Sequence, residues 1–343
     1  METAYIIEKL ILVVIVFTIT LVIAMYSTLA ERKIAGFMQD RLGPDRAGIY
    51  GMLQPLCDGG KFFFKEEIIP AGAHKPLFIL GPVIAIITAC ISSAVIPWGQ
   101  ELSIGGHTIS LQVAEVNIGV LYIFGVIALG VYGIMLGGWA SNNKFSLMGA
   151  IRAASQSISY EIGLGLSLIA LLMVTGTLQI GEIVAQQSGF VNWNIWVQPL
   201  GFLIFITCAF AECNRVPFDL PECETELVGG YHTEYSSMKL GLYMFSEYIN
   251  MFVSSALMAA LYFGGYNFPF MYDLGLSQNW ITLIGVLVFF LKIFGFIFFF
   301  MWIRWTLPRF RYDQLMNLGW KVLIPLAIAN IVLTGVVTLW FDK

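Results

Sequence analysis

The chain has 343 residues, of which 58% are hydrophobic and only 12% are charged, and its mean hydropathy is +0.80. These values exclude an ordinary soluble domain of this length. The net charge of −4 says little about partners for a chain that lies mostly in lipid.

Eight apolar runs follow one another along the chain, and most reach the length of about 20 residues that a helix needs to cross a bilayer. In hydrocarbon every backbone polar group needs an internal partner, so the runs predict helices, and the alternation typical of membrane strands is absent. We expect an all-α polytopic membrane protein with about eight transmembrane helices, forming a single membrane domain over residues 1–343. The runs are 8–30, 77–97, 117–139, 158–177, 199–213 (a short one), 240–264, 281–304 and 321–340.

The first run is interpreted as a retained span and not as a signal peptide. The stretch from Met1 to Lys9 holds more acid than base, and no small-residue cleavage site follows the apolar run. A signal peptide shows the opposite features.

The longest connection, residues 31–76, contains an amphipathic stretch. Apolar positions at Met52, Leu53 and Leu56 follow helical spacing and are flanked by Gln54 and Asp58. This pattern predicts a short helix that lies at the membrane interface. A surface-anchored connector without further function is the alternative.

The positions of the bases predict the orientation in the membrane, because basic residues concentrate in cytoplasmic connections. All but three of the 18 lysines and arginines lie in or beside the odd-numbered connections, and the exceptions are Lys9, Lys292 and Lys343. We therefore expect the odd-numbered connections on the cytoplasmic side and both termini on the periplasmic side.

The segment AECNRVPFDLPECETELVGGYHTEY, residues 211–235, concentrates acids between two apolar runs. Asp219-Leu-Pro-Glu222 has the form of a helix N-cap with a carboxylate three residues on, so it predicts a helix that ends near Val228. A solvated acidic face favoured by the helix dipole would need no function and is the alternative. One arginine, Arg215, accompanies the six carboxylates Glu212, Asp219, Glu222, Glu224, Glu226 and Glu234.

Further ionisable residues lie in or beside the apolar runs, namely Glu115, Glu161, Glu247 and Lys292. A charge at the bilayer centre costs about 2.5 kcal/mol or more, so such residues normally face a protein interior or a water-filled cavity. Two carboxylates ~6 Å apart repel by roughly 3 kcal/mol at an effective dielectric near 20, which raises the pKa of one of them. The acids therefore form a candidate proton store whose occupancy responds to nearby charge.

Motifs for a bound redox cofactor are not found in the sequence. There is no glycine-rich phosphate loop or dinucleotide fingerprint, the five cysteines show no C-x-x-C spacing, and the three histidines are scattered. We expect no metal site and no electron donor in this chain.

Three segments carry a resemblance to a known family: ERKIAGFMQDRLGPDRAGIYGMLQPLCDGGKFFFKEE (31–67), residues 211–235, and RWTLPRFRYDQLMNLGWKVLIP (304–325). The chain resembles the quinone-site membrane subunit of the proton-pumping NADH:quinone oxidoreductase, respiratory complex I, known as the H subunit in bacteria and subunit 1 in mitochondria. The likeness covers essentially the whole chain. Asp45 and Cys57 stand where the family pattern leads us to expect Asn and Ala.

The resemblance implies an eight-helix subunit that holds the membrane end of a quinone tunnel and couples quinone reduction to proton translocation. It implies tunnel or tunnel-mouth residues at Glu31, Arg32, Gln54, Asp58, Lys61, Arg215, Phe218 and Asp219. It implies an acidic funnel of Glu212, Glu222, Glu224, Glu226 and Glu234, continued by Glu161, Glu115, Glu247 and Lys292. Arg304, Arg309, Arg311 and Asp313 are interpreted as docking or helix-end contacts without chemistry.

The resemblance also implies the setting of the subunit. The substrate is a quinone, ubiquinone or menaquinone, while NADH, FMN and iron–sulfur clusters belong to partner subunits. Peripheral-arm subunits dock on the odd-numbered connections, and antiporter-like and small membrane subunits pack along the helices. We expect the protein to lie in the bacterial inner membrane, in contact with lipid, and to bind no nucleic acid. We favour the bacterial over the mitochondrial inner membrane because no transit peptide precedes the first span.

Two other functions are compatible with parts of the sequence. The related subunit of a membrane-bound hydrogenase or of a ferredoxin-dependent complex shares the acidic segment, although the intact 31–67 connection favours the quinone enzyme. A free-standing ion transporter could also contain buried acids, but such proteins often show an internal duplication with broken helices, which we do not find here.

Overall fold

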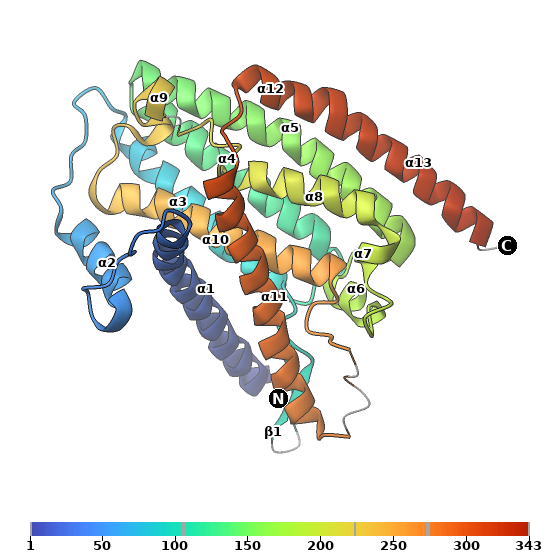
Figure 1. Cartoon of the computed structure of the whole chain (residues 1–343). Coiled ribbons are helices and arrows are strands. Elements are labelled where there is room, and N and C mark those ends of the chain that lie inside the picture. The colour runs from blue at the N-terminus through green and yellow to red at the C-terminus, as the bar shows by residue number, and fades with distance from the viewer. Residues whose placement is uncertain (1, 105–106, 223, 270, 272–274, 342–343) are drawn as a thin grey trace.

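The computed structural model describes residues 2–104, 107–222, 224–269, 271 and 275–341, and these are almost all helical (Figure 1). The long helices are α1 (Glu2–Met38), α3 (Lys75–Ser92), α4 (Gly119–Ala140), α5 (Lys144–Thr175), α10 (Ser237–Tyr262), α11 (Gln278–Thr306) and α13 (Ile324–Phe341). The shorter ones are α2 (Gln54–Phe64), α6 (Ile180–Gln186), α7 (Asn194–Val197), α8 (Pro199–Glu212), α9 (Glu224–Leu227) and α12 (Tyr312–Asn317). Single turns η1 (Ile49–Gly51), η2 (Ser93–Val95) and η3 (Gly230–His232), the π-helix η4 (Leu318–Leu323) and an antiparallel hairpin, β1 (Glu101–Ile104) with β2 (His107–Ser110), complete the described elements.

The expected fold class is confirmed. Within the described residues, seven helices are long and apolar enough to cross a membrane. The fifth predicted span corresponds to α8, which has 14 residues and is shorter than the about 20 that a full crossing needs.

Two predicted spans have the wrong bounds. Helix α1 continues to Met38, so Glu31 and Arg32 lie inside a helix and not in the connection after it. Helix α5 begins at Lys144, which places Glu161 in its middle and not near its start. The apolar run ends where polar side chains begin, but the helix continues because those side chains find partners inside the protein.

Helix α10 is the core of the molecule. All residues from Met251 to Tyr262 are buried, as expected for a helix that is surrounded by protein on every side. Its neighbours include α1, α3 and α11 (Figure 1). Beside it, α3 and α4 approach closely at Gly81 and Gly133, where the Tyr243 hydroxyl of α10 donates to the Gly133 carbonyl at 2.9 Å. A side chain at either glycine would collide with the facing backbone.

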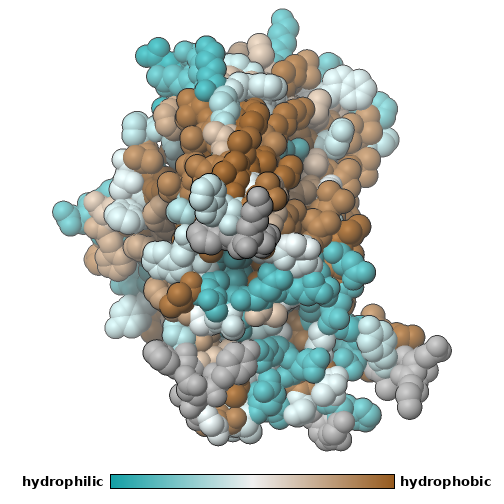
Figure 2. Space-filling model, turned by 90° about the vertical axis from the view of Figure 1, so that its right-hand side faces the viewer, coloured by the Kyte–Doolittle hydropathy of each residue, from teal (hydrophilic) through white to brown (hydrophobic). Residues whose placement is uncertain are grey.

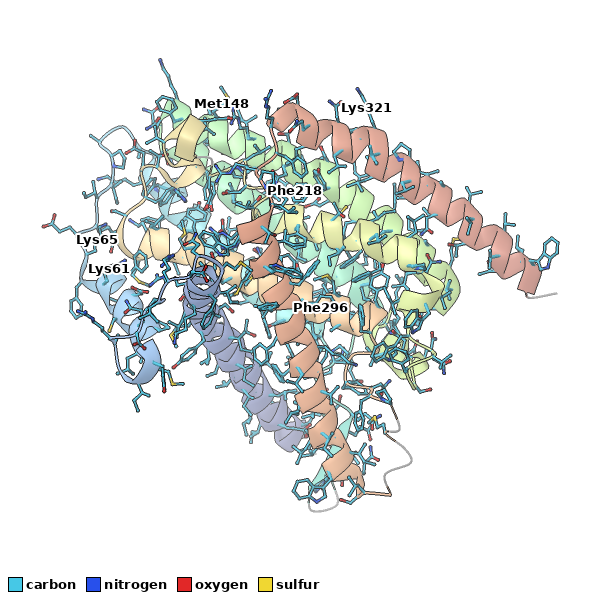
Figure 3. The ribbon with its side chains drawn as sticks, in the orientation of Figure 1. Lys61, Lys65, Met148, Phe218, Phe296 and Lys321 are labelled. Carbon is cyan, nitrogen blue, oxygen red and sulfur yellow. The ribbon has the colours of Figure 1, made fainter. Side chains whose placement is uncertain are left out.

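Helix α2 confirms the predicted amphipathic helix. It lies beside the upper end of α1 and the N-terminal half of α10, near the labelled residues Lys61 and Lys65 (Figure 3). Phe62 packs against Gly241 of α10, whereas Leu56, Phe63 and Phe64 are exposed. This arrangement suits a helix with one face on protein and another on the membrane interface.

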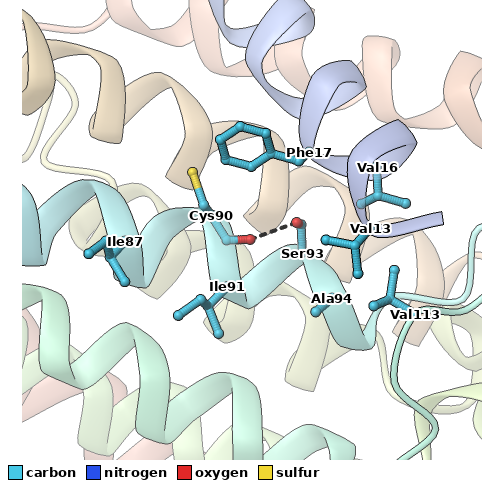
Figure 4. A pocket seen from close by; sticks show the side chains of 9 residues that line it. All are labelled: Val13, Val16, Phe17, Ile87, Cys90, Ile91, Ser93, Ala94 and Val113. Carbon is cyan, nitrogen blue, oxygen red and sulfur yellow. Dashed lines mark hydrogen bonds between the residues drawn. The ribbon is translucent and has the colours of Figure 1, made fainter. Parts of the chain in front are cut away.

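The outer surface is largely apolar. Figure 2 shows a broad hydrophobic surface in the upper half of the view, with hydrophilic side chains both at the top of the view and below this surface. An apolar groove of about 290 Å³ opens between α1 and α3, lined by Phe17, Ile87 and Cys90 among others (Figure 4). The Ser93 hydroxyl in this groove donates to the Cys90 carbonyl at 2.7 Å. Its lining residues differ from those of the larger cavity described below.

Candidate functional site

A cavity of about 540 Å³ lies between α1, α2 and α10. Its walls are predominantly apolar, and the few polar side chains are Thr28, Arg32, Asp58 and Tyr248. A cavity of this size with few placed polar groups is typical of a small-molecule site. The apolar lining comes from Leu21, Val22, Met25, Pro55, Gly59, Phe62, Phe63, Ile86, Met238, Gly241, Leu242, Met244 and Phe245.

The polar groups on α1 and α2 are paired with one another. The Arg32 guanidinium lies 2.7 Å from an Asp58 carboxylate oxygen, and the Gln54 amide donates to the other oxygen at 3.3 Å. Lys61 is exposed on the same helix, with its ammonium 4.9 Å from the centre of the Phe62 ring. Of the five residues on α1 and α2 that the resemblance placed at the tunnel, Arg32 and Asp58 line the cavity, Gln54 and Lys61 lie beside them, and Glu31 does not line it.

Tyr248 connects the cavity to a buried charge network. Its ring lines the cavity and lies 4.1 Å from the Arg215 guanidinium carbon, while its hydroxyl donates to Glu31 at 3.0 Å. One side chain is thus in contact with both the apolar space and the ionised groups. Sequence reasoning did not select Tyr248, although it directly follows Glu247.

Arg215 and Glu31 form the centre of this network. The Glu31 carboxylate, only 6% exposed, pairs with Arg215 at 3.2 Å and with Arg304 at 2.5 Å. A second nitrogen of Arg215 lies 3.9 Å from Glu247. Burial acts to lower the pKa of Arg215, but Tyr248, Glu31 and Glu247 hold it above its usual range, so the guanidinium stays charged. Arg304, interpreted as a docking or helix-end contact, lies in the last turn of α11 and joins this network through Glu31.

Asp219 is a buried acid that pairs with Arg309, a residue just beyond the end of α11. It is 6% exposed and lies 2.7 Å from the Arg309 guanidinium. The predicted helix with Asp219 as its N-cap is wrong, because the described helix in this segment, α9, covers only Glu224–Leu227. Asp219 is instead paired with a residue from a distant part of the chain. Burial, and then repulsion from Glu222, raise the pKa of Asp219 to about 7 against the opposing effect of Arg309.

Asp219 should therefore make stability depend on pH. Its pKa rises from 3.8 in the unfolded chain to about 7, so its contribution is fully present below pH 3.8 and is lost as pH rises through about 7. We expect Asp219→Asn to flatten the fall in melting temperature of the purified complex between about pH 5 and about pH 8. The exposed Asp45→Asn is the control and should keep the wild-type slope. An unchanged slope in Asp219→Asn would contradict this assignment.

Glu222 and Glu247 approach each other on the inner side of the same segment. Glu222 lies 3.2 Å from His232, and Glu247 accepts a hydrogen bond from the Tyr231 hydroxyl at 3.2 Å. Although burial alone would raise it, the pKa of Glu222 is lowered to about 2 by hydrogen bonding and charge from His232 and by hydrogen bonding to Glu247. One carboxylate of the pair is thereby held ionised. His232 and Tyr231 were not predicted as site residues.

Two small cavities connect the deeper acids. One of about 20 Å³ is lined by Glu247, Glu212 and the Asn214 side chain, and another of about 20 Å³ is lined by Glu212 and Glu161. Each has room for about one water molecule. Buried oxygens of Glu212 and Glu161 have no described protein partner, and such atoms favour hydration. Glu212 is therefore shared by two water-sized cavities, one that Glu247 also lines and one that Glu161 also lines.

The remaining acids of the 211–235 segment lie nearer the surface. Glu226 is exposed and pairs with Arg152 at 2.5 Å. Glu234 accepts from the Asn143 amide at 2.5 Å, and the Asn143 oxygen caps α5. The side chain of Glu224 lies outside the described residues.

Other candidates lie apart from this group. Phe218 is buried between the rings of Tyr160 and Phe310, with centroid distances of 5.4 and 5.5 Å, and does not line the cavity. Glu115 is exposed and accepts from the Ser110 hydroxyl beside the hairpin.

Lys292 caps a helix. Its ammonium donates to the carbonyls of Phe263, Gly265 and Asn267 at 2.7, 2.8 and 2.7 Å, just beyond the end of α10. The ring centre of Trp193 lies 4.8 Å away. No ion pair among the described residues includes this lysine, so we leave Lys292 and Glu115 out of the proposed proton route.

The fold and the site define a class: a polytopic helical membrane protein in which a large apolar cavity adjoins a buried chain of carboxylates and arginines. Residues 10–335 match a family model described as NADH dehydrogenase. The H 1 subunit of the NADH-quinone oxidoreductase of Cytophaga hutchinsonii is 69% identical over 98% of both chains. The H subunit of the Flavobacterium psychrophilum enzyme is 62% identical over 99% of this chain and all of its own length, and that of Flavobacterium johnsoniae is 61% identical over all of this chain and 98% of its own. The chain belongs to this NADH dehydrogenase family, as the resemblance of its three segments indicated.

Proposed function

We propose that this chain is the membrane subunit of an NADH-quinone oxidoreductase that binds the quinone in the cavity between α1, α2 and α10. The observation that carries the proposal is the position of Tyr248, which lines the cavity and bonds to the charge network. The names of the relatives support quinone as the substrate. Partner subunits bind NADH and hold the FMN and the iron–sulfur clusters.

The cavity suits a quinone chemically. The long apolar wall along α1 and α10 fits an isoprenoid tail, and the Arg32–Asp58 pair offers polar contacts at α2. Binding along such a wall removes apolar surface of the tail and of the protein from contact with lipid headgroups and water.

Reduction of the quinone supplies the electrostatic signal. Two electrons from the partner subunits add negative charge before two protons complete the quinol. A unit charge ~10 Å from a carboxylate changes its energy by roughly 1.7 kcal/mol at an effective dielectric near 20, which exceeds the energy of one pKa unit. Asp219, with a pKa of about 7, is poised to change its proton occupancy under such a signal.

The buried acids then pass the change onward. Glu31 and Arg215 connect Tyr248 to Glu247, and the two small cavities extend the path through Glu212 to Glu161. Carboxylates separated by about one water molecule are within reach of proton transfer. We propose that this series couples quinone reduction to proton translocation, with Glu222 beside Glu247 and with Glu226 and Glu234 at its surface end.

The two ends of the molecule support the proposed orientation. Arg215, Arg304, Arg309 and helix α2, which contains Lys61, gather at one end. At the other end Lys9 donates to the Gln112 carbonyl, and Asn279 of α11 bonds to Ser103 of the hairpin. We propose that the basic end faces the cytoplasm of a bacterial inner membrane and receives the peripheral-arm subunits, that both termini are periplasmic, and that other membrane subunits and lipid contact the outer helices.

Filling the cavity tests quinone binding. Leu21→Trp adds bulk to the wall on α1, and overpacking of this kind typically costs about 1–3 kcal/mol, so we expect quinone-dependent turnover to fall by about tenfold or more. Leu10→Trp, at a position on the same helix that is 59% exposed, is the matched control and should behave as wild type. NADH oxidation by the complex with a hydrophilic electron acceptor reports the partner subunits and should be unchanged in both. Normal quinone turnover in Leu21→Trp would contradict this location.

A further inference from the structure

Gln156 of α5 is a fully buried amide that faces the end of α8 and the segment after it. Its Nε2 donates to the Ala211 carbonyl at 2.8 Å and the Phe218 carbonyl at 2.8 Å, and it lies 3.3 Å from the Asn214 Oδ1. The two amide protons thus serve three acceptors on one side of the residue. Gln156 thus holds residues 211–218 against α5 through three contacts, which we call the Gln156 clamp.

The three acceptors share one property: each belongs to the residue immediately before a charged residue of the network. Ala211 precedes Glu212, Asn214 precedes Arg215, and Phe218 precedes Asp219. We propose that Gln156 is a positioning residue that fixes these three charged side chains relative to one another. This inference rests on the proposed function and adds to it a residue that touches neither the quinone cavity nor any of the acids it positions.

The segment needs such a clamp because its own backbone constrains it weakly. Helix α8 ends at Glu212, and Asn214 has a φ of +50°, in the left-handed region that residues other than glycine seldom adopt. Among the described backbone bonds here, Asn214 N–H to Ala211 and Phe218 N–H to Arg215 close short turns, and the one described bond from a distant part of the chain is Phe310 N–H to the Pro217 carbonyl at 3.1 Å. Phe218, labelled in Figure 3, adds a second attachment to α5 through its edge contact with Tyr160, one turn beyond Gln156. Helix α5 therefore holds the segment at two adjacent points.

The geometry of the network is sensitive to this segment. Arg215 balances Glu31 at 3.2 Å and Glu247 at 3.9 Å, and Asp219 lies between Arg309 and Glu222. Coulomb energies vary steeply over such distances in a buried site. A small displacement of residues 211–218 therefore alters which acid holds a proton at a given pH, which a purely structural contact elsewhere would not do.

The donors of Gln156 are the groups to remove. Gln156→Met keeps an unbranched side chain of similar length and removes both N–H groups. Gln156→Glu keeps the shape but turns a carboxyl toward three acceptors. The Oε1 of Gln156 is buried without a described protein partner, so neither variant breaks a protein bond that this oxygen accepts.

Gln187 provides the matched control. It is also fully buried, and its Nε2 donates to the carbonyls of Ile183 at 3.1 Å and Ala260 at 2.9 Å, at the opposite end of α10. Gln187→Met therefore removes a comparable buried donor, together with the two bonds that its Oε1 accepts from Asn194 N–H and Gly264 N–H, without touching residues 211–218. General effects of losing a buried amide on folding appear in both variants.

The experiment measures the pH profile of quinone-dependent turnover per assembled complex, together with the protons pumped per NADH in vesicles. We expect Gln156→Met to shift the alkaline limb of the profile and to lower pumping by about tenfold, because the loss of buried hydrogen bonds displaces the charges. Gln156→Glu should give the same shift, and Gln187→Met should keep the wild-type profile whatever its yield. A wild-type profile and pumping ratio in both Gln156 variants, or the same shift in Gln187→Met, would overturn the inference.

Glu212→Gln is measured in parallel to separate this inference from the proposed function. If Glu212→Gln loses pumping while the Gln156 variants keep it, the proton route stands and the positioning role of Gln156 is wrong. If Glu212→Gln also pumps normally, the proton route itself is wrong.

Discussion

Replacing Arg215 by methionine should nearly abolish the assembled, active complex. The guanidinium is 5% exposed, pairs with Glu31 and Glu247, and stacks on Tyr248. Removing one partner of a buried charge network leaves an uncompensated buried charge, which typically costs about 3–5 kcal/mol. The Glu31 carboxylate keeps Arg304, so we expect most of the cost to arise at the Glu222–Glu247 pair, in which Glu222 is held ionised. The measurements are the amount of complex on native gels and its quinone-dependent turnover.

A second substitution identifies the origin of this loss. Glu222→Gln in the Arg215→Met background removes the ionised member of the pair that is left without the charge of Arg215, so assembly should recover severalfold over the single variant. Arg215→Lys keeps the charge but loses the planar stack on Tyr248, and should assemble with reduced turnover. Wild-type assembly and turnover of Arg215→Met alone would show that Arg215 does not balance the buried acids.

Replacing Glu212 by glutamine should give the second largest effect, and it should fall on pumping. The amide has nearly the same shape as the carboxyl group, so the fold is preserved, but it cannot take up or release a proton near neutral pH. Glu212 lines both small cavities, so it is the shared member between Glu247 and Glu161. Loss of a positioned proton-transfer group typically slows transfer by about 100-fold or more. We expect proton pumping in reconstituted vesicles to fall accordingly, with quinone reduction slowed or uncoupled from it.

The control for this prediction is an acid outside the series. Glu182 on α6 bonds to Thr177, away from both small cavities. Glu182→Gln should pump as wild type. Normal pumping and normal quinone reduction in Glu212→Gln would remove Glu212 from the route.

Local patterns in the sequence predicted the helical elements well. Apolar runs predicted the long helices, and the spacing of Leu53 and Leu56 predicted the amphipathic character of α2. Both features depend on neighbouring residues and on the exclusion of water from the bilayer, so they can be read without knowledge of tertiary contacts. Helix ends were predicted less well, because the polar last turns of α1 are stabilised by distant partners of Glu31 and Arg32.

Tertiary ion pairs could not be predicted from local patterns. Asp219 resembled a helix cap, but Arg309, 90 positions away, pairs with it and the local helix does not form there. In the sequence, Lys292 is one more ionisable residue in an apolar run. In the structure its ammonium donates three hydrogen bonds to carbonyls just beyond the end of α10. The concentration of acids in residues 211–235 was visible in the sequence, whereas the role of Tyr248 between the cavity and Glu31 depends on how α1 and α10 pack.

Infrared difference spectroscopy of the intact complex, with the quinone oxidised and then reduced, tests the central claim most directly. If buried carboxyl groups exchange protons in response to the quinone, the difference spectrum contains bands of protonated carboxyl groups, and Glu212→Gln and Asp219→Asn each remove part of them. A wild-type spectrum without any carboxyl change between the two redox states would contradict the account.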